Sequence, residues 1–588
     1  MKFSLVVLAW IALSTCFGVL FGYSPLGLTP LTSIIALSTG FILAVIGLLA
    51  ERKPLFTPFE RVQITGVICA LVFLAFAARV FLRLIWTEDG TIKVLSPNNL
   101  GDICLHLSHI NFLASNPHFW PENPIYAFDK LRYPIGINLF NAELKLIGIE
   151  PRLGIIIVAL LCSAITLRAL FLFGGSFIVA AFLFNGGLAG LQFFHNWELQ
   201  DFQAKLPWAS IPLALFVTQR GLLYAIPAGL LLLAHWRGLF SDRPEAARLP
   251  GWGEWLLYAT MPIFHLHTFI FLSFLLLWWF LFGNPNWRLH LLRLVALSII
   301  PATFLVYCVT GFGKTNALAW QPGWMNPPGE SPWWFWFNNF GFVLPLSFVL
   351  LVYLCIPRRN DVYYRKIPLR RFFFPAVIAF VACGLIRFAP WAWDNTKLFF
   401  WAYILLMYCI WEAFLRRWHP LIRIPIFVAL FFSGFVSLIG GLLPGRENGY
   451  DIGDQAEWNG VADSLQNFPP QTVFATYPTY NHPVLVNGHR VVLGYEGHLW
   501  SHGLDYRAYL QTLNKAMLGE SGWEDAFRQL HADYLFWGNF EQQNYPGATR
   551  AWEHLPVVGE SSWGRIYDLR GLKAAERRSS VSQDAAQP

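Results

Sequence analysis

Apolar runs of about 18 to 22 residues, separated by short polar or basic segments, recur along most of this sequence. A run of that length suits a helix that crosses the hydrocarbon core of a bilayer, where every backbone polar group has to be satisfied within the helix. Charged residues make up 13% of the chain, against about 25% in a typical soluble domain. We therefore expect an α-helical polytopic membrane protein with about 13 transmembrane helices.

The basic residues fall in alternate loops between these runs. This is the positive-inside pattern, and it places the N-terminus in the cytoplasm with the first helix retained. The net charge of +7 is explained by these loops, so we expect a lipid bilayer and no nucleic acid as partner. Residues 206–220 are read as a re-entrant or surface-lying segment, because a second span there would invert the later loops. The expected spans are 3–22, 31–50, 62–83, 152–167, 170–192, 221–236, 252–265, 266–283, 291–311, 336–356, 372–389, 398–415 and 423–443.

The composition changes sharply near residue 444. Residues 1–443 form the expected transmembrane domain, with a large first external loop at 84–150. Residues 444–573 are expected to form a small α/β extracytoplasmic domain, and 574–588 a disordered tail. Its expected strands are 472–476, 490–495 and 532–537, with helices at 506–518 and 523–530 and a hairpin at 555–569.

The first external loop contains the segment GDICLHLSHINFLAS, residues 101–115. If it is helical, Asp102, His106 and His109 stand at positions i, i+4 and i+7 and share one face. Asp102 is either a base or the solvated N-cap of its helix. The histidines are metal ligands, polar support for Asp102 or a substrate phosphate, or ordinary packed side chains.

Further polar residues stand at the same predicted membrane face. Arginine suits bidentate recognition of phosphate and lysine acts as a point charge, although both also snorkel at membrane boundaries. Histidines beside a proline break between two spans are typical of a cavity lining. These candidate substrate-binding residues are Arg132, Tyr133, Arg220, His265, His267, Asp394, Lys397, Glu496 and His498.

The order of these elements resembles the GT-C superfamily of integral-membrane glycosyltransferases. The resemblance is architectural over nearly the whole chain, and the sequence departs from it in one respect, since Asp102 follows glycine and has no second acid beside it. The local elements that carry it are Gly101-Asp102 followed by His106, Tyr133-Pro134-Ile-Gly136, Gln219-Arg220-Gly221, Pro262-x2-His265-x-His267 and Asp394-Asn395-x-Lys397.

The resemblance implies transfer of a hexosyl or pentosyl unit from a polyprenyl-phosphate donor to an acceptor on the extracytoplasmic side, with inversion. Asp102 matches the family's loop-one acid and would be the base, while Arg220 and Lys397 would neutralise the departing phosphate. Glu496 and His498 would touch the acceptor. No resident cofactor is implied, with a divalent cation left open, and the expected location is the bacterial inner membrane.

Two other classes of function stay open at this stage. One is a transporter or flippase for a lipid or small solute of the cell envelope, in which intramembrane His and Asp relay ions. The lack of two related halves in the sequence speaks against it. The other is a catalytically silent scaffold, in which Asp102 only caps a helix.

Overall fold

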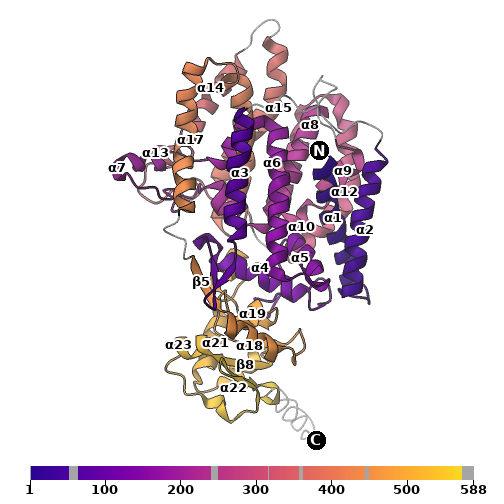
Figure 1. Ribbon diagram of the computed structural model, residues 1–588, viewed down its shortest axis with the longest axis vertical. Helices are drawn as coiled ribbons and strands as arrows, with labels where there is room; N and C mark the ends of the chain where they lie inside the picture. The colour runs from indigo at the N-terminus through magenta and orange to yellow at the C-terminus, as the bar shows by residue number, and fades with distance from the viewer. Residues whose placement is uncertain are drawn as a thin grey trace, which may run out of the picture.

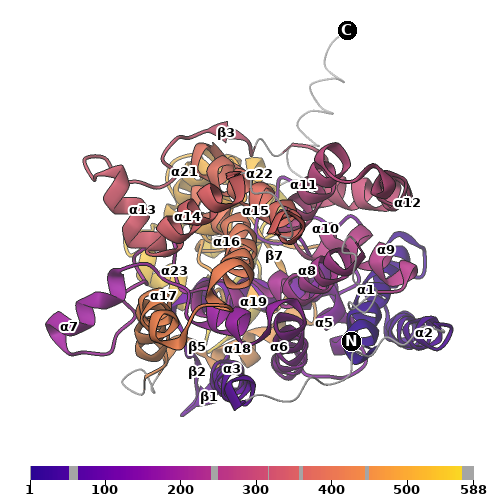
Figure 2. The same ribbon diagram turned by 90° about the horizontal axis from the view of Figure 1, so that it is seen from above.

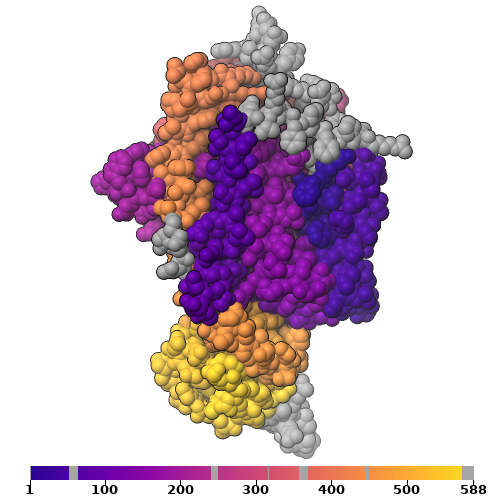
Figure 3. All heavy atoms as spheres, viewed as in Figure 1, coloured from indigo at the N-terminus to yellow at the C-terminus, as the bar shows by residue number. Residues whose placement is uncertain are grey.

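The computed structural model describes residues 2–51, 64–239, 249–314, 317–356, 362–443 and 449–572. Its helices pack side by side into an upright bundle, and the C-terminal residues form a lobe beneath one end (Figures 1 and 3). We call residues 449–572 the tail lobe and this end of the bundle the tail side. The expected disordered segment 574–588 and several expected basic loops, among them 357–361, lie outside the described residues.

Nine helices within the described ranges are long and apolar enough to cross a membrane, and a bent pair makes up to ten. The protein is therefore a multi-pass helical membrane protein, but the expected count of about 13 spans is not confirmed. The nine contain α1 (Lys2–Tyr23), α2 (Pro30–Leu49), α3 (Ile64–Leu82), α6 (Pro151–Leu183), α8 (Arg220–Leu239), α12 (Arg288–Val309), α15 (Val362–Leu385), α16 (Thr396–Ile410) and α17 (Pro420–Leu442).

Three of the expected spans are short or broken. The run at 252–265 forms α9 (Gly251–Ala259) and α10 (Met261–Phe264), and α11 (Leu266–Phe282) has 17 residues. The run at 336–356 forms α13 (Pro332–Phe340) and α14 (Val343–Cys355), which meet at 95°. Hydropathy measures the length of an apolar run and not the straightness of the helix, which explains these differences.

Helix α6 changes direction inside its apolar run. Gly175 has φ +68°, a conformation that favours glycine, and interrupts the helix. Before this break, Phe173 packs on Tyr408, with ring centres 5.0 Å apart; after it, Phe182 reaches Phe400 at 6.4 Å, two turns back along α16. The chain therefore returns toward the tail side after Gly175, with a short second arm. The expected break between 167 and 170 is wrong, because the helix continues through these residues as far as Gly174.

The segment between α6 and α8 contains short helices only, over the described residues 184–219. These are η2 (Ala189–Gln192), α7 (Phe193–Asn196) and η3 (Ile211–Phe216). Helix α7 projects from the side of the bundle near α13 (Figure 2). No second long span interrupts the run before Arg220, in agreement with the expected re-entrant or surface-lying segment.

The loop between α3 and α6 is folded and lies across the tail side of the bundle (Figure 1). It contains β1 (Trp86–Glu88), β2 (Thr91–Val94), η1 (Pro97–Asn99), α4 (Leu100–Leu113) and α5 (Gly136–Leu146). Strand β2 pairs antiparallel with β5 (Tyr450–Asp454), the first strand after the bundle. Leu105, Ile125 and Tyr126 of this loop also enter the hydrophobic core of the tail lobe. The lobe and the loop therefore hold each other in place.

The tail lobe is built on a five-stranded mixed sheet in the order β7-β6-β8-β10-β9. Strand β6 runs parallel to β7 and β8, whereas β10 is antiparallel to β8 and β9. Each expected strand and helix overlaps one here, but the limits of an independent domain at 444–573 stay a prediction. The strands are β6 (Val473–Ala475), β7 (Arg490–Val491), β8 (Tyr534–Gly538), β9 (Val557–Ser561) and β10 (Gly564–Asp568).

The remaining elements connect or flank these parts. The helices of the tail lobe are α18 (Gln455–Leu465), α19 (Pro483–Val486), α20 (Glu496–Ser501), α21 (Arg507–Leu518), α22 (Trp523–Gln529), α23 (Asn539–Asn544) and η8 (Ala551–His554). Short elements of the bundle are η4 (Pro285–Trp287), η5 (Ala392–Asn395), η6 (Trp411–Leu415) and the paired strands β3 (Ala319–Trp320) and β4 (Ile386–Arg387).

Candidate functional site

Asp102 lies in the first turn of α4, between the bundle and the tail lobe. The N-cap of this helix is Asn99, so the reading of Asp102 as the N-cap is wrong. Burial raises the pKa of the Asp102 carboxyl from its ordinary 3.8 to about 7; Lys397 opposes this shift and Asp394 adds to it. Asp394 therefore supplies, from a distant helix, the second acid that the sequence lacks beside Asp102.

The two histidines of α4 both contact the side-chain amide of Asn138. The Nδ1 of His106 lies 3.1 Å from Oδ1 of Asn138, and the Nδ2 of Asn138 lies 3.3 Å from Nδ1 of His109. Whichever way the amide is turned, one ring donates a hydrogen bond to it and the other accepts one from it. Asn138 therefore fixes both rings. It stands on α5, and our sequence reasoning missed it.

Burial also sets the charge of these rings. It lowers the pKa of His106 to about 3 and that of His109 well below its ordinary value. Both rings are consequently neutral near pH 7, as groups that support a base or bind through hydrogen bonds should be. The two Nδ1 atoms face the Asn138 amide, and the reading of Asp102, His106 and His109 as a metal site stays a prediction.

Tyr133 joins the loop to the tail lobe. Its ring centre lies 5.0 Å from that of His109, 6.1 Å from that of His106 and 5.4 Å from that of His502. His502 in turn stacks on His498, and burial lowers the pKa values of these rings to about 3 and about 4. His502 was absent from the predicted site residues, although it follows His498 by four positions and so stands one helical turn away.

His498 also lies against the start of α4. A Cβ placed on Gly101 would be 3.1 Å from its Nε2, closer than most side chains tolerate. The glycine before Asp102 thus leaves room for the imidazole. This is a packing reason for the Gly-Asp pair that the sequence alone does not reveal.

Arg220, the first residue of α8, is 2% exposed. Its Nη2 donates to the carbonyl of Ile155 at 2.8 Å, while Nη1 has no partner among the described residues. The guanidinium interacts electrostatically with His106 and Tyr133. A buried cation with an unused donor is costly unless an anion compensates it.

Lys397 and Asp394 form an ion pair at 3.0 Å where η5 meets α16. His265 and His267, on either side of the α10–α11 break, interact electrostatically with Lys397. The Nδ1 of His265 lies 2.8 Å from the hydroxyl of Thr268. Both imidazoles are therefore close enough to the cation to interact with it, and their role as a cavity lining stays a prediction.

Five buried nitrogen atoms of this cluster have no hydrogen-bond partner within the described ranges. Buried polar groups are nearly always paired, so a set of unpaired nitrogens in one place indicates room for a polar ligand. They belong to a loop helix, two bundle segments and the tail lobe. They are His109 Nε2, Arg220 Nη1, His265 Nε2, His267 Nε2 and His502 Nδ1.

Two predicted site residues lie outside this cluster. Arg132 pairs with Asp129, which also binds Lys314 at 3.3 Å. Glu496 is exposed in the first turn of α20, and no contact among the described residues joins it to Asp102. Their positions in the sequence are close to Tyr133 and His498, but side-chain direction separates them from those residues.

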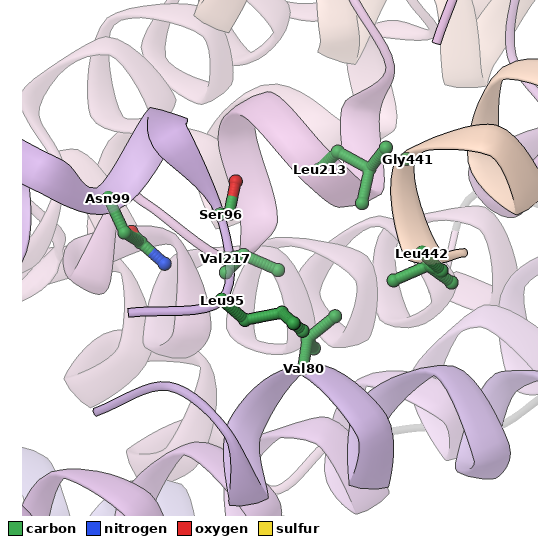
Figure 4. A pocket seen from close by; sticks show the side chains of 8 residues that line it. All are labelled: Val80, Leu95, Ser96, Asn99, Leu213, Val217, Gly441 and Leu442. Atoms are coloured by element: carbon green, nitrogen blue, oxygen red, sulfur yellow. The ribbon is translucent and has the colours of Figure 1, made fainter. Parts of the chain in front are cut away.

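A small pocket opens beside the N-terminal end of α4. Figure 4 shows that its walls come from α3, the turn before α4, η3 and the end of α17, and that most of the side chains are apolar. Asn99 connects it to the N-terminus of α4. Its lining residues are Val80, Leu95, Ser96, Asn99, Leu213, Val217, Gly441 and Leu442.

A second group of possible ligands stands at the other end of α8. His235, Glu254 and His290 place one ligand atom each within 4.8 Å of one another. The backbone N–H of Leu249 donates to Nδ1 of His235 at 2.9 Å, so this ring carries its proton on Nε2, toward Glu254. A metal needs that nitrogen deprotonated, and we interpret the group as a His–Glu–His hydrogen-bonded brace.

No family model matches the chain, and no curated protein matches it. Among solved structures, ArnT from Cupriavidus metallidurans bound to undecaprenyl phosphate is 14% identical, with a TM-score of 0.41. The match covers 86% of this chain and 98% of that one. This likeness does not place the chain in a family, and we base its function on the geometry of the site.

Proposed function

We propose that the protein is a membrane glycosyltransferase that moves a sugar from a polyprenyl-phosphate donor to an acceptor hydroxyl. One observation carries the proposal: a carboxyl with a pKa of about 7 shares a site with unpaired buried nitrogens, at the end of a membrane-helix bundle. A base and an anion receptor together are what transfer from a phosphate leaving group requires. The apolar bundle beside them suits a donor whose lipid chain stays in the bilayer.

Asp102 acts as the base in this proposal. Its carboxylate takes the proton of the acceptor hydroxyl as that oxygen bonds to the anomeric carbon. The bond from the anomeric carbon to the phosphate oxygen breaks, and the lipid phosphate leaves with the electron pair. Attack opposite the leaving group inverts the anomeric centre. A positioned base typically contributes about 10²–10⁴ in rate, most effectively when its pKa is near the working pH.

Arg220 and Lys397 bind the phosphate. The free Nη1 of Arg220 donates to it, and Lys397 exchanges its contact with Asp394 for the incoming anion. His267 donates or accepts at its unpaired Nε2. These groups are in place before the charge develops, which is the condition for electrostatic stabilisation of the transition state. We propose no resident cofactor, because the side chains provide the charge that the leaving group needs.

Orientation follows the charge pattern of the loops. We propose a cytoplasmic N-terminus, an extracytoplasmic tail lobe and a location in the inner membrane of a bacterial envelope. The acceptor would then approach from the tail side and the donor from the outer leaflet. Labelling of single cysteines introduced at Asp463 and at Arg417 with a membrane-impermeant reagent in intact cells tests this, with only the former expected to react.

Sugar transfer from radiolabelled polyprenyl-phosphate sugars, assayed with the full-length protein in liposomes, tests the activity. We expect transfer by the wild type, a loss of at least about 100-fold in Asp102→Asn, and full activity in Asp463→Asn, whose carboxyl is exposed on α18. Full transfer by Asp102→Asn contradicts the base assignment. If no lipid-linked sugar is consumed, while an ion gradient drives solute uptake, the protein is a transporter instead.

A further inference from the structure

Three tryptophans meet beside the candidate site. Trp391 and Trp393, at the start of η5, stack with ring centres 4.9 Å apart, and Trp500 of α20 reaches Trp391 at 5.9 Å. The tail lobe docks closely here, since a Cβ on Gly503 would lie 2.9 Å from the ring of Pro390. We call Trp391, Trp393 and Trp500 the tryptophan shelf. It exists only because the tail lobe and the bundle come together.

On the bundle side, the shelf adjoins the candidate site through the turn η5. Residues three apart eclipse one another in a 3₁₀ turn, and the N–H of Asp394 donates to the carbonyl of Trp391 at 3.1 Å. Trp391 is the extended residue that caps this turn, and the turn also carries Trp393 and Asp394, which holds Lys397 and interacts with Asp102. One end of the shelf thus borders the ion pair.

Helix α20 ties the shelf to the cluster on the lobe side. It carries Trp500 as well as His498, whose ring packs between those of Tyr495 and His502 at 5.3 and 6.4 Å. Helix α20 therefore carries both one tryptophan of the shelf and one imidazole of the candidate site. Aromatic faces with a few convergent polar groups are typical of small-ligand sites.

The shelf is open to solvent at Trp500. This ring is 47% exposed, whereas Trp391 and Trp393 are half-buried. Exposed residues close to Trp500 in the sequence include Glu496, Gly503 and Asp505. Indole rings with polar residues nearby suit a ligand that is itself part polar and part apolar.

We propose that the tryptophan shelf binds a sugar ring of the acceptor, and that the acceptor is therefore a carbohydrate. A pyranose presents an apolar face of C–H bonds to the electron-rich faces of the indoles and hydroxyls to the polar groups at the edge. Its reacting hydroxyl points toward Asp102. This proposal rests on the proposed function for the direction of transfer, but binding of a sugar to the shelf does not depend on it.

Saturation-transfer NMR of the full-length protein in detergent micelles, with chitotriose and cellotriose as probes, tests the binding. We expect the wild type to bind at least one probe, Trp500→Ala to weaken it about tenfold, and Trp500→Phe to retain most of it. Trp333→Ala, which removes an 87% exposed tryptophan on α13, is the matched control and should change nothing. Failure of the wild type to bind either probe overturns the proposal, as does an equal loss in the Trp333 variant.

Transfer assays on the same preparations separate this proposal from the activity itself. We expect Trp500→Ala to raise KM for the acceptor about tenfold and to leave kcat and KM for the lipid-linked donor unchanged. Donor consumption with an unaltered acceptor KM in Trp500→Ala overturns the shelf and leaves the glycosyltransferase standing. Probe binding that Trp500→Ala weakens, in a protein that consumes no donor, supports the shelf and contradicts the glycosyltransferase activity.

Discussion

Asp102 should impose a steep pH dependence on the reaction. With a pKa of about 7, the carboxyl is about 1% ionised at pH 5, half ionised at pH 7 and about 90% ionised at pH 8. Because the carboxylate is the base, kcat/KM should rise about 50-fold from pH 5 to pH 7 and only about twofold above that. An aspartate with its ordinary pKa of 3.8 would already be about 94% ionised at pH 5, and the profile would be flat.

The assay is donor consumption by the full-length protein in liposomes between pH 5 and pH 9. Asp102→Asn should lower kcat/KM by about 10²–10⁴ and remove the slope, because the amide takes up no proton. The neighbouring histidines do not produce a midpoint near 7, since burial lowers the pKa values of His106, His498 and His502 to between about 3 and about 4. A flat wild-type profile refutes the reasoning, and so does a slope that survives in Asp102→Asn.

Five further variants test the rest of the site and the packing. Asp394→Asn removes a negative charge that raises the pKa of the base, so the midpoint of the pH–rate profile should move to lower pH. Arg220→Met should raise KM for the donor at least about tenfold, with partial recovery in Arg220→Lys, as measured by initial rates. Asn138→Ala frees two imidazoles and should lower kcat several-fold without changing the thermal midpoint by more than about 3 °C. Gly187→Ala places a Cβ 1.9 Å from the carbonyl oxygen of Asn338, and should lower the free energy of unfolding by about 1–3 kcal/mol in detergent denaturation.

Local patterns in the sequence predicted the helices of this protein well. An apolar run and a helical period are properties of neighbouring residues, and α1, α2, α3 and α17 match their expected spans closely. The same holds for α4, whose Asp102, His106 and His109 stand on the helix at the predicted spacing. The turn at Gly175 was harder to predict, because two glycines within an apolar run do not by themselves indicate that the chain reverses its direction.

Contacts between distant segments could not be predicted from local sequence patterns. Asn138 looks like any polar residue of a loop helix until α5 packs on α4 and its amide meets two imidazoles. His502 gains its place only because the tail lobe docks on the loop. Arg132 is a predicted substrate-binding residue, yet its side chain pairs with Asp129.

The sequence by itself determined that the chain enters a membrane and that an acid and two imidazoles share one helix face, since hydropathy and period depend on adjacent residues. Only the tertiary structure decided what that face does. Packing half-buries Asp102 near Asp394 and Lys397, and this desolvation, which no local pattern encodes, brings its pKa to about 7. The docking of the tail lobe then adds His498, His502 and Trp500, from almost four hundred positions further along the chain, to the same site.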